Sequence, residues 1–102
     1  MEVIVVPTAE AQIREVDSWW REHRTAAPEL FVQELAAALA LIGSRPRIGR
    51  RRRHATIPGL RRVLLRSTRY HLYYVPVDEH RIFVLAVWSA VRGRGPSMKR
   101  PE

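Results

Sequence analysis

The sequence predicts an α+β fold in which a helical hairpin packs on one face of an antiparallel sheet. Over residues 9–24 and 28–43, apolar side chains recur three and four positions apart, the spacing of one helix face. Later in the chain, β-branched and aromatic runs alternate with turn residues, and another β-branched run opens the chain. The predicted order is therefore β-α-α-β-β-β, in a single domain formed by residues 1–102.

The chain is expected to begin with a strand at residues 3–6 and a helix that runs to about Arg24. Thr8 is the expected N-cap of this helix, because its hydroxyl can accept a hydrogen bond from a free backbone N–H. Trp20 fits the apolar face, whereas Trp19 should stay partly exposed, since adjacent residues do not share a helix face. An exposed tryptophan is a reasonable anchor for a protein partner.

The second helix is expected to follow a short break and to end at Gly43, a residue suited to a C-cap. Pro28 is tolerated in its first turn, where a backbone N–H would be unpaired in any case. Its apolar face is formed by Phe31, Leu35, Ala38, Leu39 and Ile42. The short link between the helices favours an antiparallel helical hairpin.

Three further strands are expected at residues 60–66, 70–77 and 82–91, with a hairpin turn at residues 78–80. Together they can form an antiparallel meander. The last run is almost wholly apolar, which is typical of a central strand. The strand that opens the chain is therefore expected to pair on the free side of the last one.

Charge is distributed very unevenly along the chain. Residues 1–44 hold three basic and seven acidic residues, whereas residues 45–102 hold 15 basic and three acidic residues. The net charge of the whole chain is +8. This asymmetry indicates a polyanionic partner, which is nucleic acid, an acidic protein or both.

Several kinds of site are disfavoured by what the sequence lacks. Without cysteine there is no disulfide and no thiolate metal site. The four histidines are scattered without the spacing of metal ligands, so neither a metal nor a cofactor is expected. No apolar run is long enough to span a membrane and no signal peptide is recognised, so we expect a cytoplasmic protein.

Two segments are expected to lack regular structure: the connection at residues 43–59, rich in Gly and Pro, and a flexible polar tail at residues 92–102. The connection holds the densest charge of the chain, Arg50–Arg53, followed by His54. These arginines predict contact with phosphates or with an acidic protein; the alternative is a solvated loop. His54 is the histidine with basic surroundings, which makes it a candidate base.

The predicted strands supply a second set of candidates. Arg62 and Arg66 share one face of a strand, and Arg92 ends the last strand, where a neighbouring strand can bring it near them. Tyr70 and Tyr74 also share a face. They either stack on nucleic-acid bases or, as is more common, pack in the core with their hydroxyls bonded to the backbone.

Several local strings follow one another in a distinctive order. They are the opening strand with Pro7, Pro28-Glu29-Leu30-Phe31, Pro46-Arg47-Ile48-Gly49-Arg50, Ile57-Pro58-Gly59-Leu60-Arg61-Arg62, Tyr70-His71-Leu72-Tyr73-Tyr74-Val75, and the strand Val84–Val91 followed by Arg92. In this order and at this chain length, they resemble the RelE/ParE superfamily of bacterial type II toxin–antitoxin toxins. The resemblance covers nearly the whole chain and implies a toxin that arrests growth.

The C-terminal tail favours one branch of that superfamily. RelE-like members are ribosome-dependent ribonucleases, and many place a Tyr or His just after the final strand as an acid or base. This sequence has Arg92-Gly93-Arg94-Gly95-Pro96-Ser97-Met98 there, so it looks more like the ParE branch. ParE-like members inhibit DNA gyrase, stalling it on cleaved DNA, and have no known catalytic residues of their own.

The resemblance therefore implies inhibition of gyrase, with its bound DNA, by binding alone, and neutralisation by a cognate ParD-like antitoxin. The residues expected to contact the target are Arg50, Arg51, Arg52, Arg53, Arg62, Arg66, Arg92 and Arg94. The residues expected to contact the antitoxin are Trp19, Arg62, Arg66 and Arg92.

Two alternatives stay open. One is a RelE-like mRNA interferase that acts on the ribosome. Its expected catalytic residues are His54, Arg62, Arg66, Tyr70 and Arg92. The other is a non-toxic basic binding module.

Overall fold

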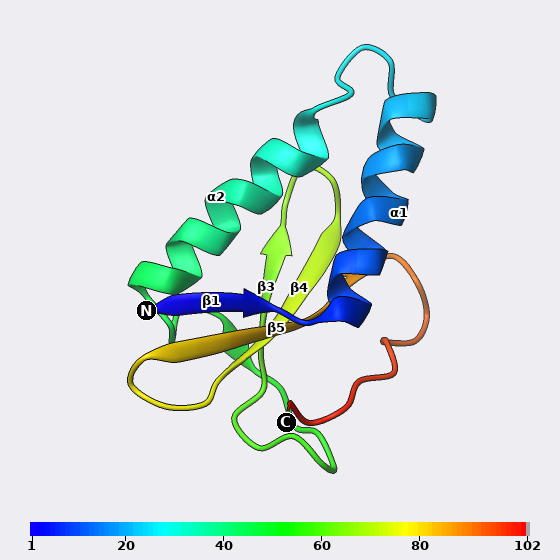
Figure 1. The fold of residues 1–102 in the computed structure, drawn as a ribbon. Helices are drawn as coiled ribbons and strands as arrows, with labels where there is room; N and C mark the ends of the chain where they lie inside the picture. Colours follow the sequence, from blue (N-terminus) through cyan, green and yellow to red (C-terminus); the bar gives the residue numbers. More distant parts are fainter. Residues whose placement is uncertain (102) are drawn as a thin grey trace.

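The computed structural model describes residues 1–101, so Glu102, the end of the predicted tail, lies outside the described residues. Two helices cover one face of a five-stranded sheet whose strand order is β1-β5-β4-β3-β2 (Figure 1). The elements are β1 (Glu2–Val5), α1 (Pro7–His23), α2 (Leu30–Ser44), β2 (Arg50–Arg51), β3 (Arg61–Leu65), β4 (Tyr70–Pro76) and β5 (Arg81–Ser89). The predicted α+β class is confirmed.

The sheet is mixed and not wholly antiparallel, which corrects one part of the prediction. β5, β4, β3 and β2 pair antiparallel, whereas β1 runs parallel to β5 and places Val3 opposite Ile82. A parallel pair needs a long connection between its strands, and both helices and three strands separate β1 from β5. β5 is central next to β1 and β4, as its apolar sequence predicts.

The core has two parts, one on each face of the sheet. The larger part lies between the helices and the sheet, where the fully buried Phe31 and Ile42 of α2 meet Leu72 and Val84. The smaller part lies on the opposite face and is formed by Ile57, Leu60, Tyr73, Val75, Leu85 and Ala86. The loop before β3 therefore covers part of the sheet face that the helices leave open.

The predicted helix ends are wrong at three positions. α1 begins at Pro7, with Val6 and not Thr8 as its N-cap, because proline has a suitable fixed φ and needs no partner for an N–H. Pro28 precedes α2 and is not part of it, since α2 begins at Leu30. Gly43 lies inside the last turn of α2, whose C-cap is Arg45.

The prediction that residues 43–59 lack regular structure is wrong in part, because Arg50 and Arg51 form the short edge strand β2. A sequence of consecutive arginines shows no alternation of apolar and polar residues, which is the usual signal for a strand. The pairing with β3 is what makes this segment extended. The other four strands begin or end one or two residues from their predicted limits.

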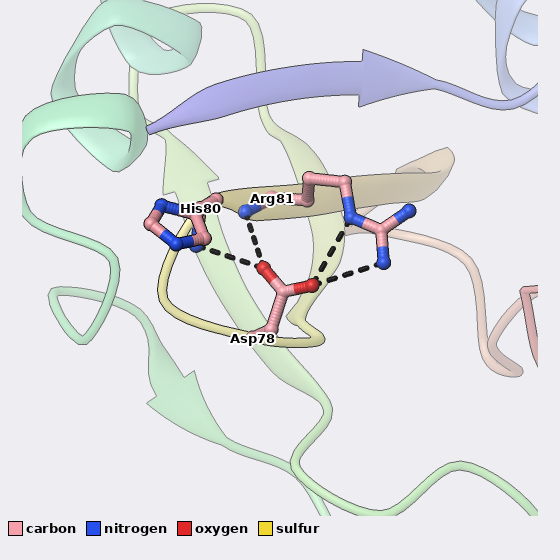
Figure 2. A network of polar contacts seen from close by, with 3 residues as sticks. All are labelled: Asp78, His80 and Arg81. Atoms are coloured by element: carbon pink, nitrogen blue, oxygen red, sulfur yellow. Dashed lines mark hydrogen bonds and ion pairs between the residues drawn. The ribbon is translucent and has the colours of Figure 1, made fainter.

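The turn between β4 and β5 is closed by a single carboxylate (Figure 2). Asp78 accepts the backbone N–H groups of His80 and Arg81 and also pairs with the Arg81 guanidinium at 2.9 Å. The bonds from His80 and Arg81 are the leading reason that the pKa of Asp78 lies below its ordinary value. The turn predicted at residues 78–80 is thus an Asp-capped hairpin.

The C-terminal tail runs back beneath the sheet, on the side away from the helices (Figure 1). Met98 packs against the smaller core, and Arg100 donates a hydrogen bond to the carbonyl of Thr56 at 3.3 Å. The tail has no helix or strand within the described residues. Neither helix of residues 1–101 has the length and apolar character needed to cross a membrane.

Candidate functional site

The middle of the chain carries a large positive charge that its own residues do not neutralise. Residues 35–77 contain ten arginines and neither Asp nor Glu. Within residues 1–101, ion pairs join carboxylates only to Arg14, Arg21 and Arg81, all outside this stretch. None of the ten arginines is therefore neutralised by an internal ion pair within residues 1–101, and their charge can attract an anionic partner.

The strands β2 and β3 place four of these arginines directly opposite one another. Arg50 lies opposite Arg62, and Arg51 lies opposite Arg61. Because side chains alternate along a strand, the two pairs point to opposite faces of the sheet. Arg61 donates hydrogen bonds to the carbonyls of Arg47 and Gly49, at 3.2 and 2.8 Å. Arg61 is thus partly used in holding the preceding loop.

Arg62 begins a row of side chains on the sheet face away from the helices, which we call the helix-free face. Register places Arg62 opposite Tyr73, and His71 opposite Trp88. The guanidinium carbon of Arg62 lies 5.9 Å from the Tyr73 ring centre, and that ring lies 6.0 Å from His71 in an edge-to-face arrangement. At the other end, the guanidinium carbon of Arg92 lies 4.6 Å from the Trp88 ring centre. An aromatic ring therefore lies next to each of the two cations, and Arg92 also lines a hollow beside Trp19 of α1.

His71 is the functional candidate in this row that sequence reasoning missed. Burial lowers the pKa of His71 below its ordinary value of 6.5, and the charges of Arg62 and Arg52 lower it further. His54, which the sequence favoured, lies in the loop before β3, where its Nδ1 accepts the N–H of Thr56 at 3.2 Å. The signal that could have found His71 is its alternation with Tyr73 on a strand next to Arg62.

A buried tyrosine fixes the loop that leads into β2. The Tyr74 hydroxyl donates to the carbonyl of Pro46 and accepts the N–H of Gly49, both at 2.8 Å. A Cβ on Gly49 would lie only 2.7 Å from that hydroxyl oxygen, so glycine is required for this close approach. The sequence left open whether Tyr74 stacks on nucleic-acid bases or packs in the core with its hydroxyl bonded to the backbone. The structure shows the second arrangement.

The arginine run lines a hollow of about 530 Å³ at the edge of the sheet. Its walls are formed by Arg51, Arg52, Arg53, His54, Ile57, Pro58, Gly59 and Leu60. Arg52 extends the pairing of β2, because its N–H donates to the carbonyl of Leu60 at 2.8 Å. The run is therefore held along one side by backbone contacts while its side chains are exposed.

The other predicted residues are not all brought to this face. Arg66 lies beyond the end of β3 in the exposed turn before β4. Tyr70 lies on the helix-covered face, where its ring packs edge-to-face on Phe31 at 5.4 Å. Arg94 follows Arg92 in the tail, and its carbonyl accepts the indole N–H of Trp88 at 2.9 Å. Trp88 thus links the tail to the helix-free face.

Trp19 lies on α1 and not on the strands β2 and β3 that carry the arginines. It is 40% exposed, stacks on His23 with ring centres 4.7 Å apart, and has the Arg24 guanidinium 5.0 Å from its ring centre. Trp20 is 8% exposed and belongs to the core, as predicted, and its indole N–H has no hydrogen-bond partner among residues 1–101. The partial exposure predicted for Trp19 is confirmed.

Two chemical capacities follow from this geometry. Exposed guanidinium groups can hold phosphates or carboxylates through paired hydrogen bonds. A half-buried imidazole with a lowered pKa can accept a proton. Within residues 1–101, no three His, Cys, Asp or Glu side chains gather as a metal site would require.

Comparison with known proteins identifies a family and shows similarity to solved structures. The family model described as the ParE toxin of the type II toxin–antitoxin system parDE matches residues 3–93. The crystal structure of the isolated E. coli RelE toxin, in its P21 form, is similar with a TM-score of 0.58 and 25% sequence identity. That similarity covers 90% of this chain and 86% of the RelE chain. No curated protein matches the sequence.

Proposed function

The chain belongs to the ParE toxin family of type II toxin–antitoxin systems, and we propose that it inhibits DNA gyrase by binding. The inhibitor acts on gyrase engaged with DNA, in the cytoplasm, and holds the enzyme in a state in which the DNA is cleaved. No bond is made or broken by this chain. A cognate antitoxin of the ParD type neutralises it.

The observation that carries this proposal is the set of unpaired arginines around β2 and the helix-free face. Arg50, Arg52 and Arg62 lack carboxylate partners within residues 1–101, and they lie on backbone that is paired between strands or hydrogen-bonded to Leu60. Gyrase bound to DNA presents phosphates close to protein, which is a surface that arginines recognise well. Arg92, held over Trp88, extends the basic surface toward the tail.

The residues that directly follow β5 agree with inhibition by binding. From Arg92 to Met98 the tail offers Gly, Pro, Ser, Arg and Met side chains, and none of these is an ordinary proton-transfer group. Its contacts hold it by a backbone carbonyl at Arg94 and by the apolar Met98. These contacts position backbone and not a reactive side chain.

Trp19 and the basic face suggest how the antitoxin would bind. Trp19 is a large exposed aromatic on α1, while Arg62 and Arg92 offer charge for an acidic segment. β1 is an edge strand, which an extended partner segment can extend by backbone hydrogen bonds. An antitoxin that reaches the helix-free face would block the surface used against gyrase.

A supercoiling assay with two double variants tests the proposal. Wild-type protein is expected to inhibit gyrase. The variant that combines Arg62→Gln and Arg92→Gln is expected to need at least about tenfold more protein for the same inhibition, because each lost charged hydrogen bond costs about 1.5–3 kcal/mol. The matched control, Arg14→Gln with Arg21→Gln on α1, removes the same charge and should inhibit like wild type. Equal loss in both variants, or no inhibition by folded wild type, contradicts the proposal.

A ribosome-dependent ribonuclease is the second candidate, because the structure is similar to the RelE toxin and His71 lies beside Arg62. In this alternative, the arginines hold the phosphate and His71 moves a proton. Primer extension on mRNA from programmed ribosomes distinguishes the candidates. Gyrase inhibition by binding predicts no new RNA ends, whereas cleavage that disappears in His71→Gln but persists in His54→Gln would establish the ribonuclease.

A further inference from the structure

Arg50 and Arg62 form an unfavourable pair within the fold. They lie directly opposite each other in a ladder, and like charges at such positions destabilise a sheet. The ladder of β2 with β3 is only two residue pairs long, so its own hydrogen bonds offset little of this repulsion. No carboxylate within residues 1–101 pairs with either side chain.

Other contacts hold this pair in place against its repulsion. Tyr74 fixes Pro46 and Gly49 just before β2, and Arg61 donates to the Gly49 carbonyl at 2.8 Å. After β2, the backbone N–H of Arg52 donates to the Leu60 carbonyl. The backbones of Arg50 and Arg62 are therefore held opposite each other before any partner arrives, and an anion bound by both side chains would relieve their repulsion.

Arg52 adds a third cation to the same face. Arg50 and Arg52 are two residues apart along the same extended segment, so their Cα atoms are about 6.8 Å apart and their side chains leave the backbone on the same face. His71, which lies on the helix-free face, feels the charges of both Arg52 and Arg62. The three arginines thus form a triad, Arg50, Arg52 and Arg62, which we call the arginine triad.

We propose that the arginine triad binds the phosphate backbone of duplex DNA directly, without gyrase. The inference rests on the proposed function, because it names DNA as the partner that this surface meets when the toxin engages gyrase. Duplex DNA carries one charge per about 1.7 Å of its axis, so several phosphates lie within reach of cations spaced in this way. Guanidinium groups match phosphates with paired hydrogen bonds.

The neighbouring aromatic residues favour a duplex over a single strand. Single-stranded nucleic acids are bound largely by stacking of bases on exposed rings. Here Tyr73 is 5% exposed, and Trp88 has Arg92 over its ring. The Tyr73 ring is buried and Arg92 covers one face of the Trp88 ring, so little ring surface is available to bases and backbone contacts dominate at this surface.

Fluorescence anisotropy with a short labelled DNA duplex, at several salt concentrations, tests this directly. The test variant combines Arg50→Gln, Arg52→Gln and Arg62→Gln. The control variant combines Arg14→Gln, Arg21→Gln and Arg24→Gln, which removes the same charge from α1. We expect the test variant to bind duplex DNA at least about tenfold more weakly than wild type. The slope of its plot of log affinity against log salt concentration should be smaller in magnitude by about 2.7, the value for three lost phosphate contacts.

The control variant is expected to bind DNA with an affinity within about threefold of that of wild type. Circular dichroism of both variants checks that they are folded. Equal weakening in both variants would mean that only net charge matters, and would overturn the proposal. Stronger binding to the single strand, to an RNA duplex or to polyglutamate than to duplex DNA would also overturn it.

A parallel supercoiling assay separates this inference from the proposed function. Gyrase inhibition by a protein that does not bind DNA would contradict the arginine triad as a DNA site and leave gyrase inhibition standing. DNA binding through the arginine triad without gyrase inhibition would contradict gyrase inhibition and leave the triad standing as a DNA site. The two measurements use the same wild-type preparation, so a folding defect cannot imitate either result.

Discussion

At the scale of single residues, Tyr74 connects the core to the strand that carries the arginines. It is fully buried, and its hydroxyl bonds to Pro46 and Gly49 on the segment just before β2. Burial raises the pKa of Tyr74, against smaller opposite effects of the Gly49 hydrogen bond and the Arg61 charge. The phenol therefore keeps its proton and remains a donor to Pro46.

Replacing Tyr74 by Phe should loosen the segment that leads into β2, while the aromatic ring keeps its packing. The carbonyl of Pro46 and the N–H of Gly49 would lose their partner, at a cost of about 1–3 kcal/mol in the free energy of unfolding. Urea unfolding measures this, and Tyr73→Phe is the control, since its hydroxyl has only a long 3.5 Å contact with Arg62. Equal stability of Tyr74→Phe and wild type would show that the anchor is unimportant.

Glu34 is a second residue whose role lies in positioning. Its carboxylate on α2 accepts the N–H groups of Ser67 and Thr68 and the Thr68 hydroxyl, at 2.8, 3.0 and 2.6 Å. Burial raises the pKa of Glu34, but the hydrogen bonds from Thr68 and Ser67 together outweigh it and bring the pKa below its ordinary value. The carboxylate ties α2 to the turn between β3 and β4.

Replacing Glu34 by Gln should lower stability at neutral pH by about 1–2 kcal/mol, a value reduced because the group is partly exposed. Because the pKa is lowered on folding, the charged form stabilises the fold above pH 4.5, the ordinary value, and this contribution is lost as pH falls through the folded pKa. Glu34→Gln should therefore show a flatter loss of stability below pH 4.5, measured by urea unfolding at several pH values. Glu29→Gln, which changes the N-cap of the same helix, is the control, and an unchanged acid profile in Glu34→Gln would contradict the account.

The positions of single side chains were predictable where they follow from local periodicity, and unpredictable where they depend on strand pairing. The alternation of side chains correctly placed Tyr70 and Tyr74 on one face, and helical spacing correctly separated Trp19 from Trp20. His71 was missed because its cationic neighbours, Arg52 and Arg62, are brought near by strand pairing and not by sequence proximity. Long-range contacts of this kind carry no local signal.

At the scale of elements, two glycines have opposite roles. Gly43 lies in the last turn of α2, where a Cβ would meet Val3 at 3.4 Å and the Met1 carbonyl oxygen at 3.6 Å, both ordinary contacts. Gly49 lies between α2 and β2, where a Cβ would be 2.7 Å from the Tyr74 hydroxyl oxygen and 3.0 Å from the Arg62 carbonyl oxygen. The same substitution by alanine should therefore change stability in opposite directions.

Gly43→Ala is expected to stabilise the protein by about 0.5–1 kcal/mol, because alanine restricts the unfolded chain and favours a helix. Gly49→Ala is expected to destabilise it by about 1–3 kcal/mol, since buried backbone and the Tyr74 ring must move. Thermal or urea unfolding of the pair gives both signs at once. Destabilisation by Gly43→Ala would mean that β1 and the end of α2 are packed more tightly than the structure indicates.

The elements were largely predictable where apolar periodicity is strong. Both helices, the three-strand meander and the central place of β5 follow from such patterns. β2 was not predictable, because its two arginines carry no periodic signal and are extended only through pairing with β3. The helix ends were shifted because Pro7 and Gly43 are compatible with more than one position near a helix end.

At the scale of the whole molecule, the uneven charge of the sequence becomes a polarity of the fold. The acidic residues of the first half lie mainly on the helices, whereas the arginines gather on β2, β3, the loops beside them and the tail. Such a molecule can present its basic side to nucleic acid or to an acidic antitoxin while its helices face away. The two partners would then compete for one surface.

The measurement that tests the central claim most directly is a gyrase cleavage assay with the purified, antitoxin-free protein. We predict loss of supercoiling together with accumulation of linear DNA, because a stalled enzyme keeps its DNA cleaved. Unaltered supercoiling and no linear DNA in the presence of folded protein would contradict gyrase as the target.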